Sequence, residues 1–98
     1  MILIELTYKV PLEQVDAHLA GHVAFLERHY AAGNLVCSGR KNPRTGGVML
    51  SSLTTIAEAE AMIKEDPFHT HSLADYRLID FTPSKYQPGF ERFLKQPS

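Results

Sequence analysis

Short segments of alternating apolar and polar residues predict four strands along this chain. In residues 2–8 every second side chain is apolar, which is the period of a strand with one buried face. Residues 35–39 and 47–53 are two further apolar segments, and the basic, turn-rich stretch 40–46 between them indicates a hairpin. The last predicted strand covers residues 76–82.

Apolar residues at helical spacing predict a first helix that begins near Pro11 and ends before Gly33-Asn34. Proline is favoured at a first helical position, and glycine or asparagine at a left-handed stop. We expect one long helix whose apolar stripe faces the sheet, formed by Leu12, Val15, Leu19, Val23, Leu26 and Tyr30.

A second helix is predicted after Thr55, because Thr55 and Glu58 have the spacing of a capping box. It should end near Asp66, since Pro67 disfavours helical geometry in the residue before it. Residues 67–72 are expected to form one more helical turn, with Asp66 as its N-cap.

The order β-α-β-β-α-β in 98 residues predicts a single α+β domain, 1–98, with a ferredoxin-like sandwich and a four-stranded antiparallel sheet. Both faces of the predicted strands carry apolar residues, which would leave one face wet in a monomer. We therefore expect a homodimer in which two sheets pack face to face as a dimeric α+β barrel. The tail, about residues 84–98, should dock on the domain or on the dimer partner.

Composition narrows the possible partners. A formal net charge of -1 argues against a nucleic-acid binder, which normally has a basic surface. The single cysteine, Cys37, forms no internal disulfide, and the chain contains no apolar run long enough to span a membrane and no signal peptide. We expect a cytoplasmic protein that binds a small molecule and interacts with neither nucleic acid nor membrane.

His22 and Asp66 are the candidate catalytic residues. His22 lies on the flank of the predicted apolar stripe, and Asp66 lies where the second helix ends. An aspartate that accepts an imidazole N–H leaves the other ring nitrogen free to act as a general base. The alternatives are a boundary histidine bonded to a carbonyl group and an aspartate that only caps a helix.

Four other residues are candidates for substrate binding. Ser38 and Arg40 flank Gly39 at the end of a predicted strand, and Arg40 could hold an anionic oxygen or else be an ordinary hairpin charge. Tyr8 and Phe68 could wall an aromatic ligand or simply pack in the core. His18 and His22 have helical metal-ligand spacing, but no carboxylate or cysteine completes a set, so we predict neither metal nor cofactor.

Several short motifs occur in an order that resembles the YCII-related (YciI-like) domain family over nearly the whole chain. They are His22-Val23-Ala24-Phe25-Leu26, Gly33-Asn34-Leu35, Ser38-Gly39, Gly46-Gly47 and Glu65-Asp66-Pro67-Phe68. The resemblance implies a ferredoxin-like dimer similar to muconolactone isomerase, with a histidine and an aspartate in the active site. Those roles correspond to His22 and Asp66 in this sequence.

Together these features favour a small cofactor-independent enzyme that transfers a proton on an aromatic or lactone-like compound, by isomerisation or by HX elimination. Two other functions remain open at this point. One is a dimeric module that binds a small ligand without turnover. The other is a cofactorless monooxygenase, in which a pocket activates an electron-rich aromatic compound toward oxygen.

Overall fold

The structure is a computed structural model and describes residues 1–95. Its sheet has four strands in the order β2-β3-β1-β4, and every neighbouring pair is antiparallel. This is the predicted ferredoxin-like α+β arrangement. The elements in chain order are β1 (Ile2–Tyr8), α1 (Leu12–Ala17), α2 (Leu19–Ala31), β2 (Leu35–Arg40), β3 (Gly46–Ser51), α3 (Ile56–Ile63), α4 (Pro67–Thr70), β4 (Ala74–Asp80) and the 3₁₀ helix η1 (Phe90–Phe93).

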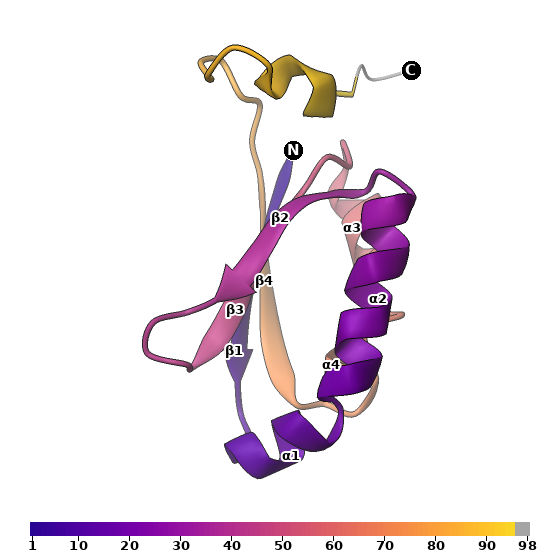
Figure 1. The fold of residues 1–98 in the computed structure, drawn as a ribbon, viewed down its shortest axis with the longest axis vertical. Coiled ribbons are helices and arrows are strands. Elements are labelled where there is room, and N and C mark those ends of the chain that lie inside the picture. Colours follow the sequence, from indigo (N-terminus) through magenta and orange to yellow (C-terminus); the bar gives the residue numbers. More distant parts are fainter. Residues whose placement is uncertain (96–98) are drawn as a thin grey trace.

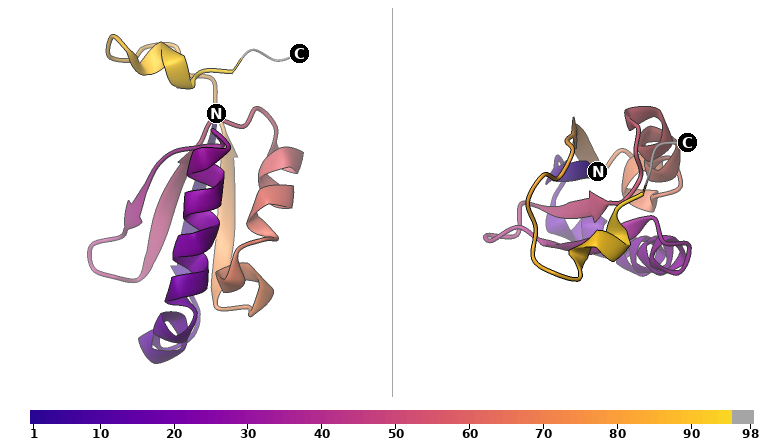
Figure 2. Two further views of the ribbon diagram at one scale, coloured as in Figure 1. Left: turned by 45° about the vertical axis from the view of Figure 1, so that its right-hand side comes forward. Right: turned by 90° about the horizontal axis from the view of Figure 1, so that it is seen from above.

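The long helix α2 and the shorter α3 and α4 cover one face of the sheet (Figures 1 and 2). The core lies between these two layers. On the sheet side it contains Ile2, Ile4 and Leu6 of β1, as the alternation predicts, and on the helix side Phe25 and Phe68, each at most 3% exposed. None of the helices within residues 1–95 is long and apolar enough to cross a membrane.

The prediction of one continuous first helix was wrong. The helix breaks at His18, whose φ of -113° is outside the helical range, and α1 turns away from α2 (Figure 1). Within α2 the predicted stripe keeps its helical spacing, but part of it is open to solvent. Val23 and Tyr30, predicted to face the core, are 42% and 39% exposed, whereas Phe25 is fully buried.

The predicted cap residues of the second helical region are confirmed. The Thr55 side chain accepts a hydrogen bond from the Glu58 backbone N–H at 3.1 Å, and Asp66 caps α4. The last strand begins two residues earlier than predicted, at Ala74 rather than Tyr76. Its pairing with β1 explains the shift, because Ala74 lies opposite Tyr8 and the β1 register fixes the rest.

The second face of the sheet is not covered by helices (Figure 2). Neighbouring strands place Leu3, Leu50 and Ile79 side by side on this face, and Ile79 is 38% exposed. Beyond β4 the tail runs across the end of the sheet near the N-terminus (Figure 1), and Lys95 Nζ donates to Asn34 Oδ1 at 3.4 Å. Docking of the tail on a partner stays a prediction, and residues 96–98 lie outside the described residues.

Candidate functional site

The side chains of His22 on α2 and Asp66 at the start of α4 are hydrogen-bonded to each other, and both are largely buried. His22 Nδ1 and Asp66 Oδ1 are 2.9 Å apart, and the side chains of these two residues are 14% and 0% exposed. A carboxylate accepts hydrogen bonds, so Nδ1 carries a proton toward Asp66. Within residues 1–95 the other ring nitrogen, Nε2, has no hydrogen-bond partner.

Every oxygen of the Asp66 carboxylate is occupied. Oδ1 also accepts the Phe68 backbone N–H at 3.0 Å, which is the cap of α4. Oδ2 accepts the hydroxyl of Tyr76 at 2.6 Å. Asp66 is therefore a helix cap and a partner of His22 at the same time. In the sequence Tyr76 is only the first residue of the predicted strand 76–82, and neither its type nor its position signals a polar partner.

Local sequence brings α2 against α4. A Cβ atom at Gly21 would lie 3.0 Å from Pro67 Cγ, so a glycine at this position lets the two helices approach closely. The approach places the His22 ring on Phe68, with centroids 4.0 Å apart and planes inclined by only 2°. The stacking on Phe68 restricts the plane of the imidazole ring, and the hydrogen bond to Asp66 determines which ring nitrogen faces the carboxylate.

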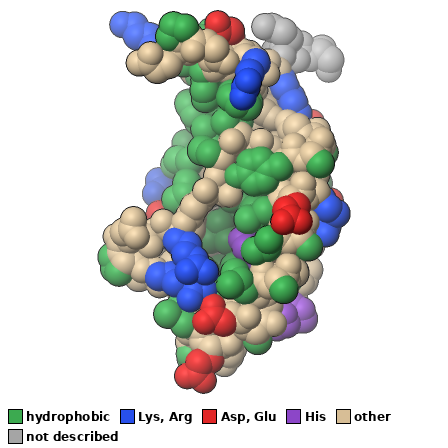
Figure 3. Space-filling view, viewed as in Figure 1, with side chains coloured by type: hydrophobic (Ala, Val, Ile, Leu, Met, Phe, Trp, Pro, Cys, Tyr) green, Lys and Arg blue, Asp and Glu red, His purple; other side chains and the backbone are tan. Residues whose placement is uncertain are grey.

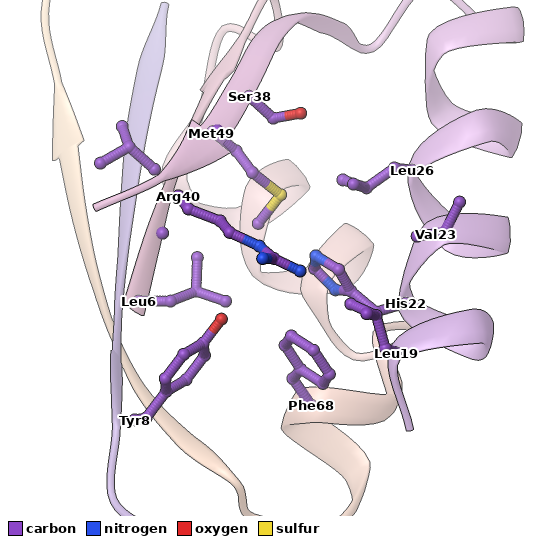
Figure 4. A pocket seen from close by; sticks show the side chains of 13 residues that line it. Leu6, Tyr8, Leu19, His22, Val23, Leu26, Ser38, Arg40, Met49 and Phe68 are labelled. Atoms are coloured by element: carbon purple, nitrogen blue, oxygen red, sulfur yellow. The ribbon is translucent and has the colours of Figure 1, made fainter. Parts of the chain in front are cut away.

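His22 borders a cavity of about 190 Å³ between α2 and the sheet (Figure 4). An apolar cavity of roughly 150 Å³ accommodates benzene, so this one has room for a single substituted ring. Figure 3 shows the hollow from outside, with hydrophobic side chains and a histidine inside it and Lys and Arg side chains on one rim. The lining residues are Leu6, Tyr8, Leu19, His22, Val23, Leu26, Ser38, Gly39, Arg40, Gly47, Val48, Met49 and Phe68.

Five of the six predicted site residues line this one cavity, and the sixth, Asp66, lies behind His22. They come from β1, α2, β2 and the α3–α4 region, which are far apart in the sequence. Ser38 Oγ lies 2.7 Å from the Tyr30 hydroxyl, at the β2 side of the cavity. Figure 4 shows the Tyr8 hydroxyl directed into the same space.

Arg40 differs from the other two cations of the hairpin. Arg44 pairs with Asp16, and Lys41 pairs with Glu5 at 3.2 Å. Arg40 forms no ion pair within the described residues, and its side chain extends from β2 across the cavity toward His22 (Figure 4). A guanidinium in this position can hold an anionic oxygen of a bound molecule.

The other histidines have different environments. Both ring nitrogens of His29 are occupied, Nε2 by Glu65 at 3.1 Å and Nδ1 by the Asn34 amide at 3.0 Å. His18 stacks on His71 with centroids 4.0 Å apart. In the part of the chain that the structure describes, no three His, Cys, Asp or Glu side chains are grouped so that they could hold a metal ion.

The fold defines a small ferredoxin-like α+β protein with a cavity between α2 and the sheet. The sequence model of the YCII-related domain matches residues 1–82, and the chain belongs to the YCII-related domain family. A search among curated proteins found no match.

Among solved structures, the chain is similar to 5-chloro-2-hydroxyhydroquinone dehydrochlorinase (TftG) from Burkholderia phenoliruptrix AC1100, determined in complex with 2,5-dihydroxybenzoquinone. The TM-score is 0.69 at 18% sequence identity, over 84% of this chain and 94% of the dehydrochlorinase. At this identity the similarity establishes the shared fold. The family match ends at residue 82, so the tail that follows lies outside it.

Proposed function

We propose that this protein is a cofactor-independent enzyme that transfers a proton on a small cyclic organic molecule. One observation carries the proposal. His22 connects a fully buried carboxylate to a cavity large enough for a ring, with its second nitrogen unpaired. This is the arrangement that a general base requires. His29, with both nitrogens occupied inside the protein, provides the contrast of a structural histidine.

In the proposed reaction, Nε2 of His22 removes a proton from the bound molecule. Asp66 stabilises the imidazolium ion that forms, because its carboxylate already accepts the Nδ1 proton at 2.9 Å. Arg40 holds the oxygen on which negative charge develops. The electron pair released by deprotonation then expels a halide, which is HX elimination, or the proton returns at another atom, which is isomerisation.

The chemistry of the cavity favours a planar substrate that carries an anionic or acidic oxygen. Phe68 and Tyr8 present aromatic surfaces, Ser38 adds a hydroxyl group, and Arg40 is a cation that lines the cavity and forms no ion pair within residues 1–95. Hydroxyquinones fit this description, and the similar dehydrochlorinase binds one of them. We therefore propose halogenated hydroxyquinols and related lactones as the first substrates to test. The single, unpaired Cys37 is in keeping with action in the cytoplasm.

A substrate screen tests the proposal against the two rival functions. Binding of 2,5-dihydroxybenzoquinone is measured by calorimetry, and chlorinated hydroxyquinols, lactones and phenols are offered while released halide, isomerised product and dissolved oxygen are followed. Halide release or isomerisation without oxygen uptake supports the proposal. Binding with no turnover supports a ligand-binding module, and oxygen uptake with an electron-rich phenol supports a monooxygenase.

We also propose a homodimer formed through the face of the sheet that the helices leave open. Leu3, Leu50 and Ile79 lie there side by side, and burying them against a second copy would remove apolar surface from water. Analytical sedimentation at micromolar concentration should give about twice the chain mass of 11.0 kDa. Replacement of Leu50 with lysine should shift the protein toward the monomer. A monomeric wild-type protein of full stability would contradict this prediction.

A further inference from the structure

Tyr76 contacts Asp66 of the candidate site although it does not line the cavity. It lies on β4 opposite Leu6, and its hydroxyl donates to Asp66 Oδ2 at 2.6 Å. It is the partner of the one carboxylate oxygen that neither His22 nor the α4 backbone uses. A buried carboxylate oxygen without a donor would be costly, so the Tyr76 hydroxyl helps to stabilise the buried position of Asp66.

Tyr76 acts from outside the ligand cavity. It is not among the residues that line that cavity, and it borders a separate groove on the outer side of β4, together with His69 and Lys64. Its ring therefore separates Asp66 from this groove, and its hydroxyl reaches the proposed reaction centre only through Asp66. A ligand in the cavity would contact His22 and Arg40 but not Tyr76.

We propose that Tyr76 is a positioning residue of this site. Its hydroxyl fixes the plane of the Asp66 carboxylate and takes up part of its negative charge, and it thereby limits how firmly Asp66 holds the protonated form of His22. This inference rests on the proposed role of His22 as a base. A base that is held too firmly in its protonated form is less available at neutral pH, so the Tyr76 hydroxyl keeps His22 ready to accept a proton.

The Tyr76 hydroxyl remains a hydrogen-bond donor throughout the pH range in which a histidine titrates. Burial, followed by the negative charge of Asp66 and the hydrogen bond to it, raises the pKa of the Tyr76 hydroxyl far above its ordinary value. Tyr76 therefore stays neutral and protonated while the imidazole titrates. The ionisable groups near the phenol are Asp66, Tyr8 and His69, and the groove beside its ring also contains Lys9, Glu60, Lys64 and Asp75. On the cavity side, Arg40 extends toward the imidazole (Figure 4).

Replacement of Tyr76 with phenylalanine removes only the hydroxyl and keeps the ring that separates Asp66 from the groove. The full charge of the carboxylate then acts on the imidazole. We expect the NMR titration of the His22 C2–H signal to move to higher pH, because the carboxylate that holds the imidazolium loses the donor that takes up part of its charge. The matched control is Tyr86→Phe in the exposed tail, which should leave the titration unchanged.

Turnover gives a second readout once a substrate is known. Tyr76→Phe should move the acidic limb of the rate profile to higher pH by the same amount, and KM should stay within about twofold because Tyr76 does not touch the cavity. An unchanged His22 titration, or one that moves to lower pH, would overturn the inference. If no substrate is ever turned over, the proposed function fails while the NMR result still decides the role of Tyr76.

If Tyr76→Phe does not fold, the interaction between Tyr76 and Asp66 can be measured on Tyr76 instead, in a variant of Asp66. Asp66→Asn removes the charge that helps to raise the pKa of the Tyr76 phenol, so that pKa should fall, while burial continues to keep it above the ordinary value. Because the buried phenol titrates above the pH range in which the protein stays folded, the change is read at neutral pH from the ¹³C signal of Tyr76 Cζ, which responds to the charge of the group that accepts the hydroxyl proton. An identical Tyr76 Cζ signal in wild type and Asp66→Asn would overturn the inference.

Discussion

Replacement of His22 with glutamine should reduce turnover by about two to four orders of magnitude, the range that positioned general acid–base groups contribute. Glutamine can still donate to Asp66, so the partner that Asp66 has at 2.9 Å is partly retained and the fold should persist. Steady-state kinetics on a substrate from the screen measure the effect. Circular dichroism and thermal unfolding check that the variant is folded.

The control for this variant is His71→Gln. His71 stacks on His18 and does not line the cavity, so its loss should change the rate by less than about twofold. A His22→Gln protein with the wild-type rate would show that the base lies elsewhere in the cavity. The proposed mechanism would then be wrong even if the enzyme releases halide.

Replacement of Asp66 with alanine should lower the free energy of unfolding by about 3 to 5 kcal/mol, because leaving one buried donor without an acceptor costs about 1 to 3 kcal/mol and three donors are affected. A helix cap alone would account for only about 1 kcal/mol. The larger effect is expected because three donors lose their acceptor at once, namely His22 Nδ1, the Phe68 backbone N–H and the Tyr76 hydroxyl. Urea denaturation of wild type and variant measures the difference.

The Asp66→Asn variant distinguishes the helix-capping role of Asp66 from the role of its negative charge. The amide oxygen can still accept the Phe68 backbone N–H, and asparagine caps a helix about as well as aspartate, so the loss of stability should be clearly smaller than in Asp66→Ala. Turnover should nevertheless fall by roughly a hundredfold, because no negative charge remains to stabilise the protonated His22. Equal stability of wild type and Asp66→Ala would contradict the central position that the structure gives to this carboxylate.

Local periodicity was enough to predict the order of helices and strands along the chain, and the short motifs of the family resemblance pointed to His22 and Asp66. Alternation in residues 2–8 identified the buried face of β1, and the capping residues Thr55 and Asp66 marked where α3 and α4 begin. Tyr8, Ser38, Arg40 and Phe68 converge on the cavity because the ferredoxin-like topology brings their elements together.

Two features were beyond the sequence pattern for physical reasons. The helix breaks at His18, a position without the proline or glycine that would mark a break, and the predicted apolar stripe included Val23, which lines the open cavity, and Tyr30, whose hydroxyl lies beside Ser38. The bond between Tyr76 and Asp66 depends on the path of the turn between α4 and β4. Neither residue type nor spacing encodes that path.

The protonation of the two ring nitrogens of His22 tests the central claim most directly, and it requires no substrate. In ¹⁵N-labelled protein at a pH where the imidazole is neutral, we predict that Nδ1 carries the proton, bonded to Asp66, and that Nε2 is bare. Addition of 2,5-dihydroxybenzoquinone should then shift the Nε2 resonance far more than that of Nδ1. A His22 ring with its proton on Nε2 and a bare Nδ1 would contradict the proposal that Asp66 holds this histidine as a base.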